Sequence, residues 1–308
     1  MSRATRFGPA VPVIRVRSAG PVAGPILREG APLTVTAVFE RSFYCRDGRD
    51  RWLCFLRDDL EPGPLHALSE NWPTCLGEHI SEGQILTLDG RGAMTASTLA
   101  VDCAMFREWH PPPFPPPEPR ALHRALPLLR EAMRMSAPEG TLAEWMLAGR
   151  RPGAAVRCAA AEETARALAA LSTWLASPHE HPLRDAVQSL VGLGPGLTPT
   201  GDDILAGTLL ALHALAVKKE ADELAVALAA HGPGGTNRIS LAHLRAAAAG
   251  WGAAPFHDLL TEVLLGREAF DKTLRRIAAI GHTSGWDILM GILTTAECFM
   301  AKHEHAAL

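Results

Sequence analysis

The stretch Val191-Gly-Leu-Gly-Pro-Gly-Leu-Thr-Pro-Thr-Gly-Asp-Asp-Ile-Leu-Ala-Gly207 decides how the second half of this chain folds. Its glycines and prolines end a helix and let backbone N–H groups approach a ligand closely. Thr198 or Thr200 can cap the helix that follows. Asp202 and Asp203 then fall in its first turn. The residues after them are apolar on every side, which predicts a buried helix whose start opens into an interior cleft.

A second copy of this pattern lies near the C-terminus. The segment Ser284-Gly-Trp-Asp-Ile-Leu-Met-Gly-Ile-Leu293 repeats the order of residue types in Thr200-Gly-Asp-Asp-Ile-Leu-Ala-Gly-Thr-Leu209. Each copy has a glycine inside the expected helix, where glycine costs about 1 kcal/mol relative to alanine. That cost indicates that two backbones pack closely at these glycines. We therefore expect two buried helices that cross near their starts and bring Asp203 and Asp287 together.

Composition limits the classes of protein that the chain can represent. A chain of 308 residues is long enough for two domains. A net charge of −3 gives no electrostatic basis for binding nucleic acid or an anionic membrane surface. The first residues contain no apolar signal segment, and no apolar stretch reaches the roughly 20 residues that cross a bilayer. The six cysteines lack metal-site spacing, so we expect reduced thiols and a cytoplasmic location.

Three segments of different composition predict an α+β protein. Residues 1–109 contain short alternating strands separated by Gly, Pro and Asp, which is typical of a small β barrel or sandwich. Residues 110–119 form a stiff proline-rich linker. Residues 120–308 are expected to form a C-terminal all-α helical bundle domain that carries the site. Its predicted helices are 120–135, 141–149, 154–176, 181–191, 202–217, 219–230, 237–249, 256–265, 268–280 and 285–301.

The glycine-rich loop matches neither of two common nucleotide-binding motifs. It lacks the lysine of a P-loop, and no strand precedes it as a dinucleotide fingerprint requires. Helix N–H groups and threonine hydroxyls favour an anion, whereas Asp202 and Asp203 oppose one. Two functional interpretations follow: the aspartates hold Mg²⁺ or Ca²⁺ that bridges to the anion, or they accept hydrogen bonds from an amide or ammonium group. The structural alternative is that they only cap the helix.

Two further segments complete the candidate site. The segment Thr236-Asn-Arg-Ile-Ser240 begins another helix, and arginine is a natural partner of carboxylate or phosphate. His282 can act as a general base or donate to an anion. Alternatively, this segment is an ordinary helix cap and His282 makes a structural hydrogen bond. Mg²⁺ is the candidate cofactor, with no metal ligands assigned. The predicted catalytic residues are Asp203, Asp287 and His282, and the predicted substrate-binding residues are Gly194, Gly196, Thr198, Thr200, Gly201, Asp202, Thr236, Asn237, Arg238, Ser240, Ser284 and Gly285.

The string from Gly192 to Gly207 resembles the signature of a bacterial family, the AllH-like subunit of oxamate carbamoyltransferase. The segments 236–240 and 281–291 resemble its later blocks. The resemblance implies a subunit that works with partner subunits in purine (allantoin) nitrogen catabolism. The implied reaction moves a carbamoyl group between oxamate or oxalurate and phosphate or carbamoyl phosphate.

The residues themselves are compatible with this chemistry and with two alternatives. A small carbamoyl or amide substrate of this kind has an anionic end, suited to helix starts and hydroxyls, and an amide end, suited to aspartates. One alternative is a metal-dependent hydrolase of a small amide or phosphate compound. The other is a non-catalytic subunit that binds a ligand or serves as a scaffold.

Overall fold

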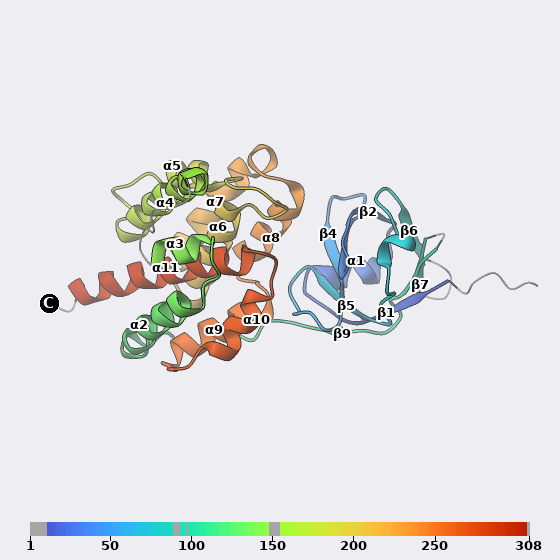
Figure 1. The fold of residues 1–308 in the computed structure, drawn as a ribbon, viewed down its shortest axis with the longest axis horizontal. Helices are drawn as coiled ribbons and strands as arrows, with labels where there is room; N and C mark the ends of the chain where they lie inside the picture. Colours follow the sequence, from blue (N-terminus) through green and yellow to red (C-terminus); the bar gives the residue numbers. More distant parts are fainter. Residues whose placement is uncertain (1–10, 89–92, 97, 148–154, 307–308) are drawn as a thin grey trace, which may run out of the picture. The chain divides into compact units, whose positions relative to one another are not determined.

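A computed structural model describes the chain except for residues 1–10, 89–92, 97, 148–154 and 307–308. The chain divides into two compact units, Met1–His110 and Pro111–Leu308 (Figure 1). The first unit contains the described strands, the second contains α2 to α11, and each has its own hydrophobic core. The expected α+β class is therefore confirmed.

The first unit is a closed β barrel. Around the barrel the strands follow the order β5-β4-β3-β2-β6-β7-β8-β1, and β1 pairs again with β5, which closes the ring. β9 pairs with β1 outside this ring. Closure leaves few exposed strand edges. The strands are β1 Val13–Ala19, β2 Leu33–Val38, β3 Ser42–Arg46, β4 Trp52–Arg57, β5 His66–Glu70, β6 Ile85–Leu88, β7 Ala93–Thr95, β8 Ala100–Asp102 and β9 Arg107–Glu108.

Alternating burial accounts for the strands, but one element of the barrel unit differs from the sequence prediction. In β1 the buried Ile14 and Val16 alternate with exposed residues, as a half-buried strand requires. No helix was expected among residues 1–109, but the structure contains the helix α1, Ala23–Glu29. This helix buries Ile26 and Leu27 and ends at Gly30 with φ of 64°. Seven residues are too short to show a helical repeat in the sequence.

The second unit is helical throughout its described residues. Each of the ten predicted ranges overlaps one helix; α6 and α9 begin two residues earlier than expected, and α7 and α11 extend several residues further. Positions 148, 149 and 154 of these ranges lie outside the described residues. None of the described helices combines the length and the apolar composition needed to cross a bilayer. The helices are α2 Pro119–Ser136, α3 Leu142–Leu147, α4 Ala155–Ala176, α5 Leu183–Leu190, α6 Thr200–Ala214, α7 Lys218–Gly235, α8 Arg238–Ala248, α9 Ala254–Leu264, α10 Asp271–Ala278 and α11 Ser284–Ala306.

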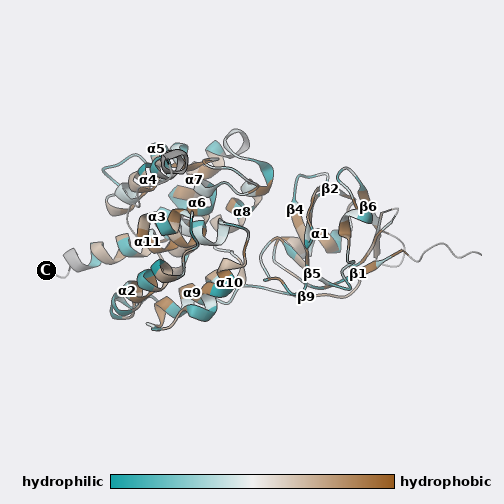
Figure 2. Ribbon diagram, in the orientation of Figure 1, coloured by the Kyte–Doolittle hydropathy of each residue, from teal (hydrophilic) through white to brown (hydrophobic). Residues whose placement is uncertain are grey.

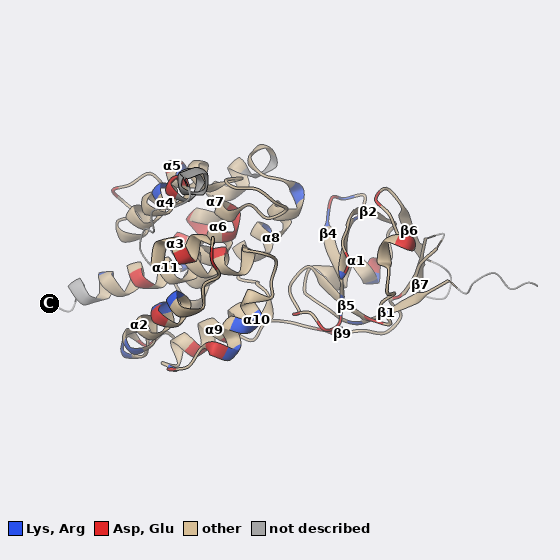
Figure 3. Ribbon diagram, viewed as in Figure 1, with Lys and Arg blue, Asp and Glu red and all other residues tan. Residues whose placement is uncertain are grey.

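The helix α6 lies in the middle of the helical core. All its residues from Gly201 to Leu212 are buried, as its apolar sequence predicted. The outer helices α2 and α9 instead carry hydrophilic and hydrophobic segments in alternation (Figure 2). Figure 3 shows an acidic segment on α6, where Asp202 and Asp203 lie. Two carboxyl groups are thus buried in the most apolar part of the unit, which requires specific partners for them.

Candidate functional site at the crossing of two helices

The helices α6 and α11 touch backbone to backbone at two glycines. A Cβ atom added to Gly207 would lie 2.0 Å from the carbonyl oxygen of Ile288. One added to Gly291 would lie 2.1 Å from the carbonyl oxygen of Ile204. The contact is reciprocal, because Ile204 and Ile288 hold the same position in the two sequence copies. The close packing expected from the glycines is therefore confirmed.

The repeat extends back into the turns that precede both helices. The N–H of Leu193 donates to the carbonyl oxygen of Leu190, and the N–H of Gly201 donates to Leu193, both at 2.9 Å. In the second copy the N–H of Ile280 donates to the carbonyl oxygen of Ile277 at 2.9 Å. The N–H of Gly285 donates to the carbonyl oxygen of Ile280 at 3.1 Å. The helix–turn–helix unit α5–α6 therefore recurs as α10–α11.

The first turn is longer because it carries the glycine-rich loop. Residues 194–200 separate the two bonded positions in the first copy, whereas only 281–284 do so in the second. Gly194 and Gly196 lie in this longer turn with φ of 106° and 105°, values that favour glycine. Residues 194–197 are exposed. The glycine-rich loop is thus an addition to one copy of the repeat, and it lies at the surface.

The two first turns exchange side-chain contacts. Thr200 Oγ1 donates to Asp287 Oδ2 at 3.0 Å. Conversely, the Ser284 hydroxyl contacts the Asp203 carboxyl group, which the Thr198 hydroxyl also contacts. Thr198 Oγ1 and Ser284 Oγ lie 2.8 Å apart. The first hydroxyl of each helix therefore meets the aspartate of the other helix, and the two aspartates converge as the repeat predicted.

The expected capping role of the threonines was wrong. Pro199 holds the cap position of α6, and no side chain caps the helix there. The hydroxyls of Thr198 and Thr200 are directed to α11 instead, because Ser284 and Asp287 lie across the crossing.

Asp202 joins three segments of the chain. Its Oδ1 accepts the Gly192 N–H at 2.8 Å, and its Oδ2 accepts the Ser240 hydroxyl at 2.5 Å. The Thr236 hydroxyl also donates to Oδ2. Only 1% of Asp202 is exposed. The carboxyl group thus holds the glycine-rich loop and the start of α8 against α6.

Asp203 differs from its neighbour because one of its oxygens is unsatisfied. Its Oδ2 is buried and has no hydrogen-bond partner among the described residues. Burial raises the pKa of Asp203 well above its ordinary value, and the charge of Asp287 raises it further against the opposing Ser284 and Thr198 hydroxyls. Burial also raises the pKa of Asp287 to about 6, while the hydroxyls of Thr200 and Thr283 limit the rise.

The raised pKa of Asp287 predicts a loss of stability with rising pH. The folded state binds the Asp287 proton more tightly than the unfolded state, so its contribution is full below the ordinary value of 3.8 and lost as pH rises through about 6. Wild type should lose roughly 3 kcal/mol relative to Asp287→Asn over this window. Urea unfolding of both proteins from pH 4 to 7 measures the difference. A constant difference would contradict the prediction.

The remaining predicted residues fall into three groups. Gly201 and Gly285 serve packing, because a Cβ atom at either would lie 1.9 Å or 2.2 Å from a backbone carbonyl oxygen of the preceding helix. Asn237 caps α8 by accepting the Ser240 N–H at 3.0 Å, and its Nδ2 donates to the Leu197 carbonyl of the loop at 2.8 Å. Arg238 and His282 are exposed.

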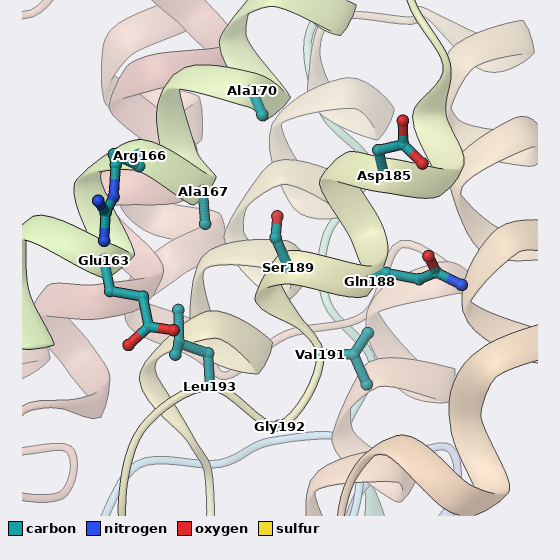
Figure 4. A pocket seen from close by; sticks show the side chains of 10 residues that line it. All are labelled: Glu163, Arg166, Ala167, Ala170, Asp185, Gln188, Ser189, Val191, Gly192 and Leu193. Atoms are coloured by element: carbon teal, nitrogen blue, oxygen red, sulfur yellow. The ribbon is translucent and has the colours of Figure 1, made fainter.

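The sequence missed two features near the crossing. Trp286 takes the place of Asp202 in the second copy; it is 2% exposed, and its Nε1 has no hydrogen-bond partner among the described residues. An open pocket of about 650 Å³ also lies between α4, α5 and the start of the loop (Figure 4). Nothing in the sequence indicated this pocket, because it depends on how the consecutive helices α4 and α5 pack against each other. Its lining residues are Glu163, Arg166, Ala167, Ala170, Asp185, Gln188, Ser189, Val191, Gly192 and Leu193.

The aspartates do not form a three-ligand metal site. Within the parts of the chain that the structure describes, no group of three His, Cys, Asp or Glu side chains is arranged to hold a metal ion. Asp202 is directed to Gly192 and Ser240, whereas Asp203 and Asp287 meet at the crossing.

The fold and the site define an α+β protein whose helical unit contains a repeated helix pair with two buried, converging aspartates. Residues 190–296 match the family described as oxamate carbamoyltransferase subunit AllH. This match confirms the expected resemblance to that family, and it spans every predicted site residue. A comparison with curated proteins found no match. A comparison with solved structures found none either.

Proposed function

We propose that this chain is a subunit of an oxamate carbamoyltransferase-like enzyme and that its substrate binds at the crossing of α6 and α11. The unsatisfied Oδ2 of Asp203, buried opposite Asp287, is the observation that carries the proposal. The matched family supplies the reaction class. The cytoplasmic location, the role in purine nitrogen catabolism and the other subunits belong to the same proposal.

The proposed reaction transfers a carbamoyl group from oxalurate to phosphate. A phosphate oxygen attacks the carbamoyl carbon, the carbon–nitrogen bond breaks, and the released nitrogen takes a proton to give oxamate. The intermediate bears negative charge on the former carbonyl oxygen, which fixed hydrogen-bond donors stabilise. Thr198, Thr200 and Ser284 place hydroxyl groups at the crossing; Asp203 contacts those of Thr198 and Ser284, whereas Asp287 accepts that of Thr200. We assign Asp202 to positioning, because its oxygens already accept three hydrogen bonds.

Ligand-dependent thermal stabilisation tests this assignment. A ligand at about 100 times its Kd should stabilise the folded protein by roughly 2.7 kcal/mol. We expect oxalurate, oxamate or carbamoyl phosphate to raise the Tm of wild type but not of Asp203→Ala. Phosphate alone and Mg²⁺ alone serve as separate arms.

The matched control is Asp222→Ala, which removes an exposed carboxylate of α7 and should respond like wild type. Stabilisation by Mg²⁺ alone would favour a metal-dependent hydrolase over carbamoyl transfer. Binding without turnover by the assembled complex would favour a ligand-binding or scaffold subunit.

A further inference from the structure

The Asp203 carboxyl group has a buried oxygen that no group of the described residues satisfies. Asp203 is 4% exposed, and its Oδ2 lacks a hydrogen-bond partner among the described residues. Leaving a buried polar atom unsatisfied is unfavourable, whereas burying it against a partner is not. A ligand group that bonded to Oδ2 would remove this penalty. Oδ2 is therefore the atom of this carboxyl group that remains available to a ligand.

The surroundings of the two carboxyl groups at the crossing shift their pKa values by different amounts. The charged groups that act on Asp203 are both acidic: Asp287 from α11 and Asp202 from α6 itself. The loop contributes the neutral hydroxyl of Thr198, and the Ser240 hydroxyl of α8 donates to Asp202 instead. Burial and these charges raise the pKa of Asp203 well above its ordinary range, whereas that of Asp287 rises to about 6. Asp203 therefore keeps its proton more strongly than Asp287, so Asp203 is the candidate O–H donor of the pair and Asp287 the candidate carboxylate acceptor.

We propose that Asp203 and Asp287 bind a primary amide or carbamoyl group as a pair, with the Asp203 O–H donating to its carbonyl oxygen and Asp287 accepting from its NH₂. This inference rests on the proposed function and names the group of the substrate that the site recognises. A primary amide presents an acceptor and a donor side by side, which matches the pair. A carboxylate presents two acceptors and a negative charge, which Asp287 repels.

Two partly exposed hydroxyl groups contact the buried Asp203. They belong to Thr198 and Ser284, which also bond to one another at 2.8 Å. We expect this contact to open when a ligand reaches Oδ2. Thr198 belongs to the exposed glycine-rich loop. Gly194 and Gly196 in this loop allow its backbone to change conformation.

Calorimetric titration with two probes of nearly equal size tests the inference. Oxamate has one primary amide and one carboxylate, whereas oxalate has two carboxylates. At pH 7 the full-length wild-type protein should bind oxamate at least about tenfold more tightly than oxalate. Equal or tighter binding of oxalate, absence of oxamate binding to the folded protein, or binding that requires Mg²⁺ would each overturn it.

Variants separate the donor from the acceptor. Asp203→Asn keeps an N–H donor, so its Kd for oxamate should stay within about threefold of the wild-type value. Asp203→Ala has no donor, so its Kd should rise at least about tenfold. Asp287→Asn removes the charge that repels oxalate, so the ratio of the oxalate Kd to the oxamate Kd should fall toward one. Circular dichroism confirms that each variant is folded. If Asp203→Asn loses as much affinity as Asp203→Ala, the donor role is wrong.

Failure of this inference can be distinguished from failure of the proposed function. If the protein prefers oxamate but the assembled complex forms no carbamoyl phosphate from oxalurate and phosphate, amide recognition stands and carbamoyl transfer fails. If the complex transfers the group while the wild-type chain binds oxalate as tightly as oxamate, carbamoyl transfer stands and amide recognition fails.

Discussion

Replacing Gly207 with alanine is expected to lower the free energy of unfolding by about 2–3 kcal/mol. In most helices this change is stabilising by about 1 kcal/mol, because alanine has the higher helix propensity. Here the new methyl group would lie 2.0 Å from the carbonyl oxygen of Ile288, so α6 and α11 must move apart. Urea unfolding followed by circular dichroism measures the change.

A second helical glycine provides the matched control. Gly234 lies in α7, and no atom lies within 4 Å of a Cβ added to it. Gly234→Ala should therefore leave stability unchanged or raise it by up to about 1 kcal/mol. If the free energy of unfolding falls for Gly207→Ala but not for Gly234→Ala, the backbone contact is established. A stabilised Gly207→Ala protein would show that the helices are further apart than described.

Replacing Asp202 with alanine should lower the free energy of unfolding by about 3–5 kcal/mol. The change leaves three donors without an acceptor in a buried position: the Gly192 N–H and the hydroxyls of Thr236 and Ser240. Each unsatisfied donor costs about 1–3 kcal/mol unless it finds water. The same urea titration measures the loss. Limited proteolysis should also show faster cleavage in the exposed segment 194–197, which Asp202 holds in place through Gly192.

The isosteric variant Asp202→Asn provides the comparison. Its amide oxygen can still accept the Gly192 N–H, and its NH₂ can donate to the Thr236 and Ser240 hydroxyls after they rotate. The free energy of unfolding of Asp202→Asn should therefore fall by no more than about 1–2 kcal/mol. If Asp202→Ala proves as stable as Asp202→Asn, the three hydrogen bonds do not hold the loop.

The helical unit was largely predictable because its signals are local and repeated. The glycine at the same place in each copy indicated the close crossing, and the shared Ile and Leu positions indicated burial. The separate roles of Asp202 and Asp203 were not predictable. Neighbouring residues on a helix point about 100° apart, so Asp202 meets Ser240 of α8 while Asp203 meets Ser284 of α11. Which neighbour lies on which side depends on packing between distant helices.

The barrel was less predictable for a related reason. Its closure depends on the pairing of β1 with β5, whose residues Arg15 and Glu70 are far apart in the chain. Short strands with weak alternation indicate a barrel or a sandwich equally well. The strand β5 contains His66 and Ser69 among its five residues, a composition that carries little strand signal. Only the complete set of pairings distinguishes the two architectures.

The exchange of contacts between the two copies has a consequence for symmetry. Each copy supplies the hydroxyl for the other's aspartate and the carbonyl that the other's glycine accommodates, so a single copy cannot assemble the crossing alone. A chain with only one copy would need a second identical molecule, related by a two-fold axis. In such a dimer every residue would be the same on both sides. Two copies within one chain are free of that requirement, and this crossing uses the freedom: Asp202 and Trp286 differ at equivalent positions, and only one of the two turns carries the glycine-rich loop.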